Sequence, residues 1–231
     1  MNMSQTKTKT RTKTSVKIGI AVGAMAIAAA GFFFAIPRVS YPSVALMSTS
    51  TLPSVPGEHE VMYFYVSTKK SDTRLREVTF EIDSTDNEAS GWNTCGQLGA
   101  ISTDPAATDL HGWSLYDMSH GGRADTEASW AFYDSANVNC ADSSVVDHPV
   151  AYAVVASPLA SVIPASPRGT LTGETYILFA DTSGASAVTD DSFRVTIPDT
   201  TPAIIWEDDR GVARNARFIS GLPVVGSTII F

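Results

Sequence analysis

The sequence is poor in cysteine, and its front end has no acidic residues. Only two of the 231 residues are cysteine, which excludes a disulfide miniprotein of the small secreted type. Charged residues make up 17% and apolar residues 44%, too apolar for a wholly disordered chain. All 24 acidic residues follow Arg38, whereas six of the 16 basic residues lie at or before it. The chain after Arg38 therefore carries ten basic and 24 acidic residues, a net charge of −14. We expect no nucleic-acid partner, because phosphate binding needs a basic surface.

Motifs typical of catalysis are also missing. The four histidines are His59, His111, His120 and His148. They show neither the H-x-x-E-H nor the H-E-x-x-H spacing of helical metal ligands. No G-x-S-x-G nucleophile motif is present, and the segment 120–123 (HGGR) has the composition of a turn. We therefore predict that the protein is not an enzyme.

The front of the chain has the pattern of a membrane-targeting segment. Residues 1–17 alternate threonine with basic residues, which predicts a disordered cytoplasmic tail. Residues 18–36 contain no charge, and as a helix they span about 28 Å, close to the hydrocarbon thickness of a bilayer. The preceding basic residues favour a cytoplasmic N-terminus and an extracellular C-terminal domain. We predict a single-pass transmembrane signal anchor. The alternative is a signal peptide cleaved near Ala45, after the small residues of Ser43-Val44-Ala45, which would release a secreted protein.

The rest of the chain divides into a linker and one β-rich domain. Residues 37–57 are rich in serine, threonine and proline, which predicts an extended linker. Period-2 alternation then predicts about ten short strands, at 61–66, 73–83, 112–117, 128–134, 150–156, 174–180, 192–197, 203–207, 215–220 and 227–231. The inward-facing residues expected in two of them are Val78, Phe80 and Ile82, and Phe193, Val195 and Ile197. Residues 58–231 are therefore predicted to form an extracytoplasmic, all-β domain. Its expected fold is an antiparallel two-sheet Ig-like sandwich, preceded by the single N-terminal hydrophobic helix; a jelly roll or a pair of small sandwiches is the alternative.

The two cysteines, Cys95 and Cys140, are predicted to form one disulfide, because both lie on the extracellular side. The bond would close a loop of about 45 residues and contribute about 4 kcal/mol in the chain-entropy model. Two isolated cysteines are too few for a metal centre.

Two groups of residues are candidates for ligand binding. Asp181, Asp190 and Asp191 lie around one loop and supply oxygen ligands suited to Ca²⁺, although the D-x-D-x-D-G pattern is absent and turn closure is the simpler interpretation. Trp92 and Trp113 lie near glycines and are the more plausible exposed pair for stacking on a glycan, although anchoring in the core or in a loop is the preferred interpretation of both. No other cofactor is expected.

Several segments resemble a known class of surface module. They are 57–61 (GEHEV), 75–80 (LREVTF), 176–198 (YILFADTSGASAVTDDSFRVTIP), 205–208 (IWED) and 221–231 (GLPVVGSTIIF). Together they are similar to an uncharacterised β-rich module of large cell-surface proteins of candidate-phyla bacteria. The resemblance implies a secreted envelope module and assigns no catalytic residue.

Two functions remain open from the sequence. The first is a membrane-anchored cell-envelope protein with a structural or interaction role, whose partners are other envelope proteins or a host surface. The alternative is an extracellular ligand-binding module for a glycan or calcium, secreted after signal cleavage.

Overall fold

The computed structural model describes residues 41–48, 56–99, 112–126, 128–156, 159, 162–166, 172–200, 202–214 and 219–231. The segments predicted as a cytoplasmic tail (1–17) and as a transmembrane anchor (18–36) lie outside these ranges. Within them, no helix has the length and apolar character needed to cross a membrane.

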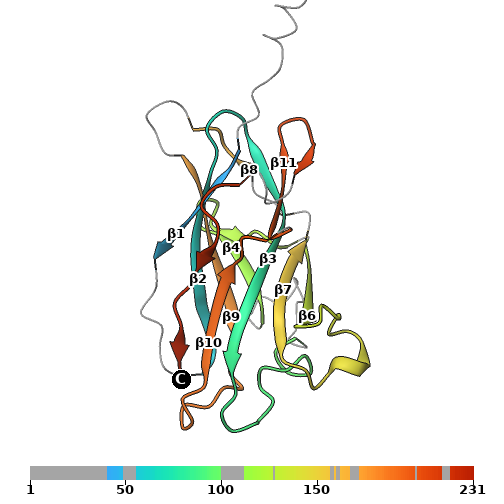
Figure 1. The fold of residues 1–231 in the computed structure, drawn as a ribbon. Helices are drawn as coiled ribbons and strands as arrows, with labels where there is room; N and C mark the ends of the chain where they lie inside the picture. The colour runs from blue at the N-terminus through green and yellow to red at the C-terminus, as the bar shows by residue number, and fades with distance from the viewer. Residues whose placement is uncertain are drawn as a thin grey trace, which may run out of the picture. The chain divides into compact units, whose positions relative to one another are not determined.

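The described residues form two antiparallel sheets (Figure 1). The first sheet has the strand order β1-β2-β9-β4-β5, with bounds β1 Ser43–Ser48, β2 Glu58–Ser67, β9 Gly173–Asp181, β4 Ser114–Asp117 and β5 Gly122–Arg123. The all-β, antiparallel two-sheet prediction is thus confirmed at this level. A short 3₁₀ helix at Ser143–Val145 is the one helical element among the described residues, and the Asp142 side chain caps it.

The second sheet is organised around one long strand, β3 (Thr73–Thr85). Residue Val78 pairs with Ile204 of one neighbour and with Val155 of another, so these neighbours lie on opposite edges of β3. On one edge lie β10 and then β11, and on the other lie β7 and then β8. The bounds in this sheet are β6 Ser129–Asp134, β7 Val150–Ala156, β8 Val162–Ile163, β10 Ser192–Ile197, β11 Ile204–Asp208, β12 Ala213–Arg214, β13 Val224–Val225 and β14 Ile229–Ile230.

The alternation read from the sequence corresponds to the observed burial. Phe193, Val195 and Ile197 of β10 are buried, and so are the three residues expected to face inward on β3. Side chains from both sheets meet in one hydrophobic core, where Phe64 of β2 packs against Phe80 of β3 with their ring centroids 6.2 Å apart. The period-2 pattern therefore identified the buried face correctly in both strands.

The predicted linker is wrong over part of its length. Residues 43–48 form β1, which pairs with β2 along the edge of the first sheet. Val44 is 1% exposed within the core, and its N–H donates to the Ser220 carbonyl over 2.9 Å. The prolines and serines around this strand concealed it, and of residues 43–47 only Val44 is buried. The folded domain therefore begins before Glu58.

The predicted disulfide between Cys95 and Cys140 is confirmed, with 5.1 Å between their Cα atoms. The bond joins the segment that follows β3 to the segment that follows β6. Backbone hydrogen bonds support the same junction: the Cys95 N–H donates to the His148 carbonyl, and the Cys140 N–H donates to the Phe132 carbonyl. The disulfide therefore fixes loops that the sheets alone do not hold.

Candidate functional site

Trp92 and Trp113 are not an exposed pair for stacking on a glycan, and the preferred interpretation of core anchoring is confirmed. They are 3% and 1% exposed, and both belong to the hydrophobic core. The ring of Trp113 packs edge-on against Phe132 at 5.6 Å, and Trp92 lies 6.0 Å from the terminal residue Phe231. The neighbouring glycines are typical of surface loops, but burying an indole ring stabilises the fold more than leaving the ring exposed to solvent. Neither indole offers a face to a glycan.

The aspartates predicted to bind calcium have different surroundings. Asp191 is buried, and its carboxylate accepts hydrogen bonds from the backbone N–H groups of Asn87 and Ser186. Asp181 accepts from the N–H of Ser183, which is the hydrogen-bond pattern of a turn. Asp190 is exposed and has a positive φ of 56°. The simpler interpretation, in which these aspartates shape the loop, accounts for the hydrogen bonds of Asp181 and Asp191.

A different cluster brings three potential ligands together. Among the described residues, Asp117, His120 and Glu174 place one ligand atom each within 4.8 Å of one another. Asp117 ends β4, His120 lies in the loop that joins β4 to β5, and Glu174 is the second residue of β9. Because β4 pairs with β9, the end of one strand lies beside the start of the other.

Hydrogen bonds hold the cluster in position. The Oδ1 atom of Asp117 accepts from the N–H groups of Ser119 at 2.9 Å and His120 at 3.2 Å. Its Oδ2 atom lies 2.7 Å from Nδ1 of His120. The N–H of Gly121 donates to the Asp117 carbonyl and closes the turn. The loop therefore directs the imidazole toward the buried carboxylates.

The electrostatics of the cluster are dominated by negative charge. The hydrogen bond with Asp117 raises the pKa of His120, and the charges of Asp117 and Glu174 raise it further. Glu174 also contributes to a raised pKa of the Tyr65 hydroxyl, after the larger effect of burial. Both carboxylates are buried, whereas the His120 side chain is 62% exposed. The two carboxylates thus favour a positive charge at His120, the residue through which the cluster contacts solvent.

Asp125 anchors the hairpin that carries this cluster. Its carboxylate is buried and accepts from the N–H of Leu115, from the Arg123 guanidinium and from Nε1 of Trp130. These bonds connect β4 and β5 to β6 of the second sheet. They limit how far Asp117 can move.

A second histidine forms a similar pair without a third ligand. Nδ1 of His148 lies 2.8 Å from Oδ2 of Asp134, and the His148 side chain is 55% exposed. The hydrogen bond with His148 lowers the pKa of Asp134, as do the N–H groups of Val138 and Ala136. Among the described residues no further carboxylate joins this pair to form a group of three.

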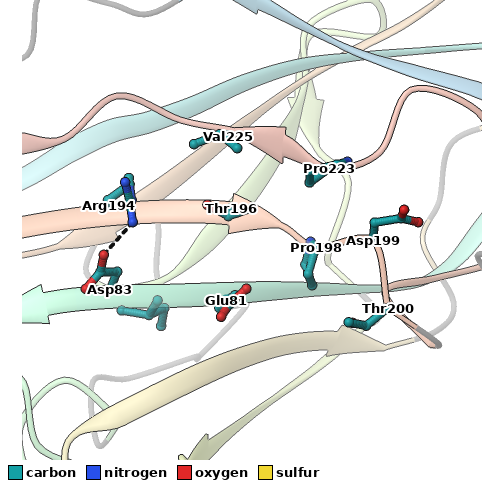
Figure 2. Close-up of a pocket in the computed structure, with 10 residues that line it drawn as sticks. Glu81, Asp83, Arg194, Thr196, Pro198, Asp199, Thr200, Pro223 and Val225 are labelled. Atoms are coloured by element: carbon teal, nitrogen blue, oxygen red, sulfur yellow. Dashed lines mark hydrogen bonds and ion pairs between the residues drawn. The ribbon is translucent and has the colours of Figure 1, made fainter.

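A hollow of about 560 Å³ lies on the outer side of the second sheet (Figure 2). Glu81 and Asp83 of β3 and Arg194 and Thr196 of β10 lie beside each other there, and Val225 of β13 lines its edge. The Arg194 guanidinium pairs with Asp83 at 2.5 Å. The hollow is open, its lining mixes polar side chains with Ile82, Val225 and two prolines, and its Arg194 already pairs with Asp83, so its shape does not indicate a particular ligand.

No protein-family model matches the chain, and neither a curated protein nor a solved structure is significantly similar to it.

Asp117 and Glu174 were not among the residues predicted to bind a ligand, and His120 was predicted only as part of a turn. The spacing Asp-x-x-His before two glycines was the available signal, since a short loop returns the histidine to the aspartate. Glu174 lies in a run of β-forming residues 54 positions after His120, and only strand pairing brings it close.

Proposed function

We propose that this protein is a membrane-anchored cell-envelope module with a structural or interaction role, displayed outside the cell and without catalytic activity. The observation that carries the proposal is the Cys95–Cys140 disulfide, because structural disulfides persist in oxidising compartments and are rare in the cytosol. The basic front end, the uncharged segment 18–36 and the net charge of −14 after Arg38 agree with export of the domain. The resemblance to surface modules of candidate-phyla bacteria also supports it, and an Ig-like topology remains a prediction.

The position of β1 favours the anchored form over cleavage near Ala45. Cleavage there would divide β1 and remove Val44, which is buried and bonded to Ser220. A mature chain starting at Leu46 would therefore leave the edge of the first sheet incomplete. This cost favours retention of the segment that precedes the domain.

The alternative proposal is a secreted module that binds a glycan or calcium. Its predicted residues offer it little support, since the two tryptophans are buried and the Asp191 carboxylate already accepts hydrogen bonds from the backbone of Asn87 and Ser186. The polar hollow beside Arg194 is the remaining observation in its favour.

The test is the intact mass of the native protein in separated membrane and medium fractions. Thiols are alkylated after denaturation, with and without prior reduction, because Cys95 is buried in the folded domain. We expect a membrane-bound species that retains residues 18–36 and is alkylated only after reduction. The Cys140→Ser variant is the control, since its remaining thiol reacts without reduction. A soluble species starting near Leu46 would contradict the anchor, and free thiols in the native protein would contradict an exported domain.

A further inference from the structure

We propose that Asp117, His120 and Glu174 form a binding site for a divalent transition-metal ion, with Zn²⁺ as the ion that fits best. This site goes beyond the proposed function and does not depend on it, because the argument uses only the local geometry. The three residues converge from β4, its following loop and β9.

The strongest indication is the state of Glu174. The residue is 4% exposed, and its Oε2 atom is buried without a hydrogen-bond partner. The cationic group beside it is the imidazole of His120, whose Nδ1 atom lies 3.5 Å from Oε2. A buried carboxylate oxygen without a hydrogen bond is costly, so proteins normally supply a donor or a metal ion. Here the oxygen points into a group of two further ligand atoms.

The ligand types select the class of metal ion. One imidazole nitrogen and two carboxylate oxygens suit Zn²⁺ and related transition metals, whereas Ca²⁺ and Mg²⁺ prefer an all-oxygen shell. Two buried carboxylates also bring negative charge that a divalent cation neutralises. The cluster therefore favours zinc over the alkaline-earth ions.

Both distances from His120 require only a small adjustment, and the three ligand atoms all lie within 4.8 Å of one another. Ligand atoms around a tetrahedral Zn²⁺ ion lie about 3.4 Å apart, given metal–ligand distances of about 2.1 Å. The His120–Glu174 distance of 3.5 Å already matches this spacing. The His120–Asp117 distance of 2.7 Å must open by about 0.7 Å, which is a shift of an exposed loop side chain. Asp117 and Glu174 lie on paired strands, so the carboxylates provide the rigid part of the site.

The fourth coordination position faces solvent. His120 is the exposed member of the three, whereas both carboxylates lie beneath it. Three protein ligands and one open position are typical of zinc sites that accept water or an outside ligand. The site can therefore take a water molecule or a donor atom from a neighbouring molecule.

The experiment is a calorimetric titration of the untagged full-length chain with Zn²⁺, repeated with Ca²⁺ and Mg²⁺. We expect one Zn²⁺ per chain and much weaker binding of the other two ions. His120→Asn and Glu174→Gln should each weaken Zn²⁺ binding about tenfold or more. His148→Asn is the matched control, since it removes an equally exposed histidine from a His–Asp pair without a third ligand. Its affinity for Zn²⁺ should equal that of the unaltered chain.

A second measurement separates loss of the site from loss of the fold. Co²⁺ can replace Zn²⁺, and its visible absorption spectrum depends on its ligands. The absorption bands of a low-coordinate Co²⁺ site should appear in the unaltered chain and in His148→Asn. They should be absent in His120→Asn. His120 is exposed, so circular dichroism should show that His120→Asn keeps its fold even if Glu174→Gln does not. Three results would overturn the proposal: no stoichiometric Zn²⁺ binding, unchanged binding in a folded His120→Asn, or equal weakening in His148→Asn.

Discussion

Gly221 is the position where one added methyl group should do most damage. Its φ of +95° lies in the region that glycine adopts at no steric cost. A Cβ atom there would lie 1.9 Å from the carbonyl oxygen of Val44, well inside contact distance. The neighbouring Ser220 carbonyl accepts the Val44 N–H, so the glycine lies where β1 meets the second sheet.

The cost of Gly221→Ala has two parts. A non-glycine residue at positive φ costs about 1 kcal/mol. The overlap with Val44 must be relieved by moving β1, and an overpacked site of this kind costs about 2 kcal/mol more. We expect a total loss of about 3 kcal/mol, which lowers the melting temperature by about 9 °C for a domain of this size.

Gly121→Ala provides the matched control. Gly121 has a φ of +68°, and an added Cβ there would meet no atom within 4 Å. Only the backbone cost of about 1 kcal/mol applies, so its melting temperature should fall by about 3 °C. Thermal unfolding of the full-length chain, followed by circular dichroism in mild detergent, compares the two variants. Equal melting temperatures would refute the contact between Gly221 and β1.

Three further predictions concern the disulfide, acid stability and the core. Cys140→Ser should lower the free energy of unfolding by about 4 kcal/mol, measured by denaturant titration. The pKa of Asp134 is lowered in the folded state, chiefly by His148, so its stabilisation is complete above the ordinary carboxyl pKa and is lost as the pH falls through the folded value. Asp134→Asn should therefore flatten the acid side of the stability curve, measured by denaturant titration at a series of acid pH values. Trp113→Ala should lower the free energy of unfolding by about 4 kcal/mol, and Trp113→Phe by less than half of that. The phenylalanine costs less because the buried indole N–H has no acceptor to lose. Equal losses in chemical unfolding would contradict the packing described for this ring.

Much of the fold follows from local patterns. Strands β7 and β10 have the predicted bounds, and the buried face of β10 was identified residue by residue. Alternation is visible in the sequence because one face of each strand is buried and the other is not. The pattern fails for β1, because its apolar residues 44–47 do not alternate with polar ones and its pairing with β2 is visible only in the fold.

The candidate site could not be predicted in the same way. Asp117 and His120 are three residues apart, but Glu174 joins them only through the pairing of β4 with β9. Trp92 and Trp113 lie near glycines in the sequence, and only the packing of distant segments around them decides that they belong to the core. Pairing and burial both depend on residues far apart in the chain.

The sequence by itself determined the all-β class, the buried face of the main strands and the cysteines that pair, because each depends on periodicity or on residue count. Only the tertiary structure decided that residues 43–48 belong to the domain, that two tryptophans lie in the core and that a buried glutamate meets a histidine. These features arise from contacts between distant segments. No local pattern encodes the strand order that creates them.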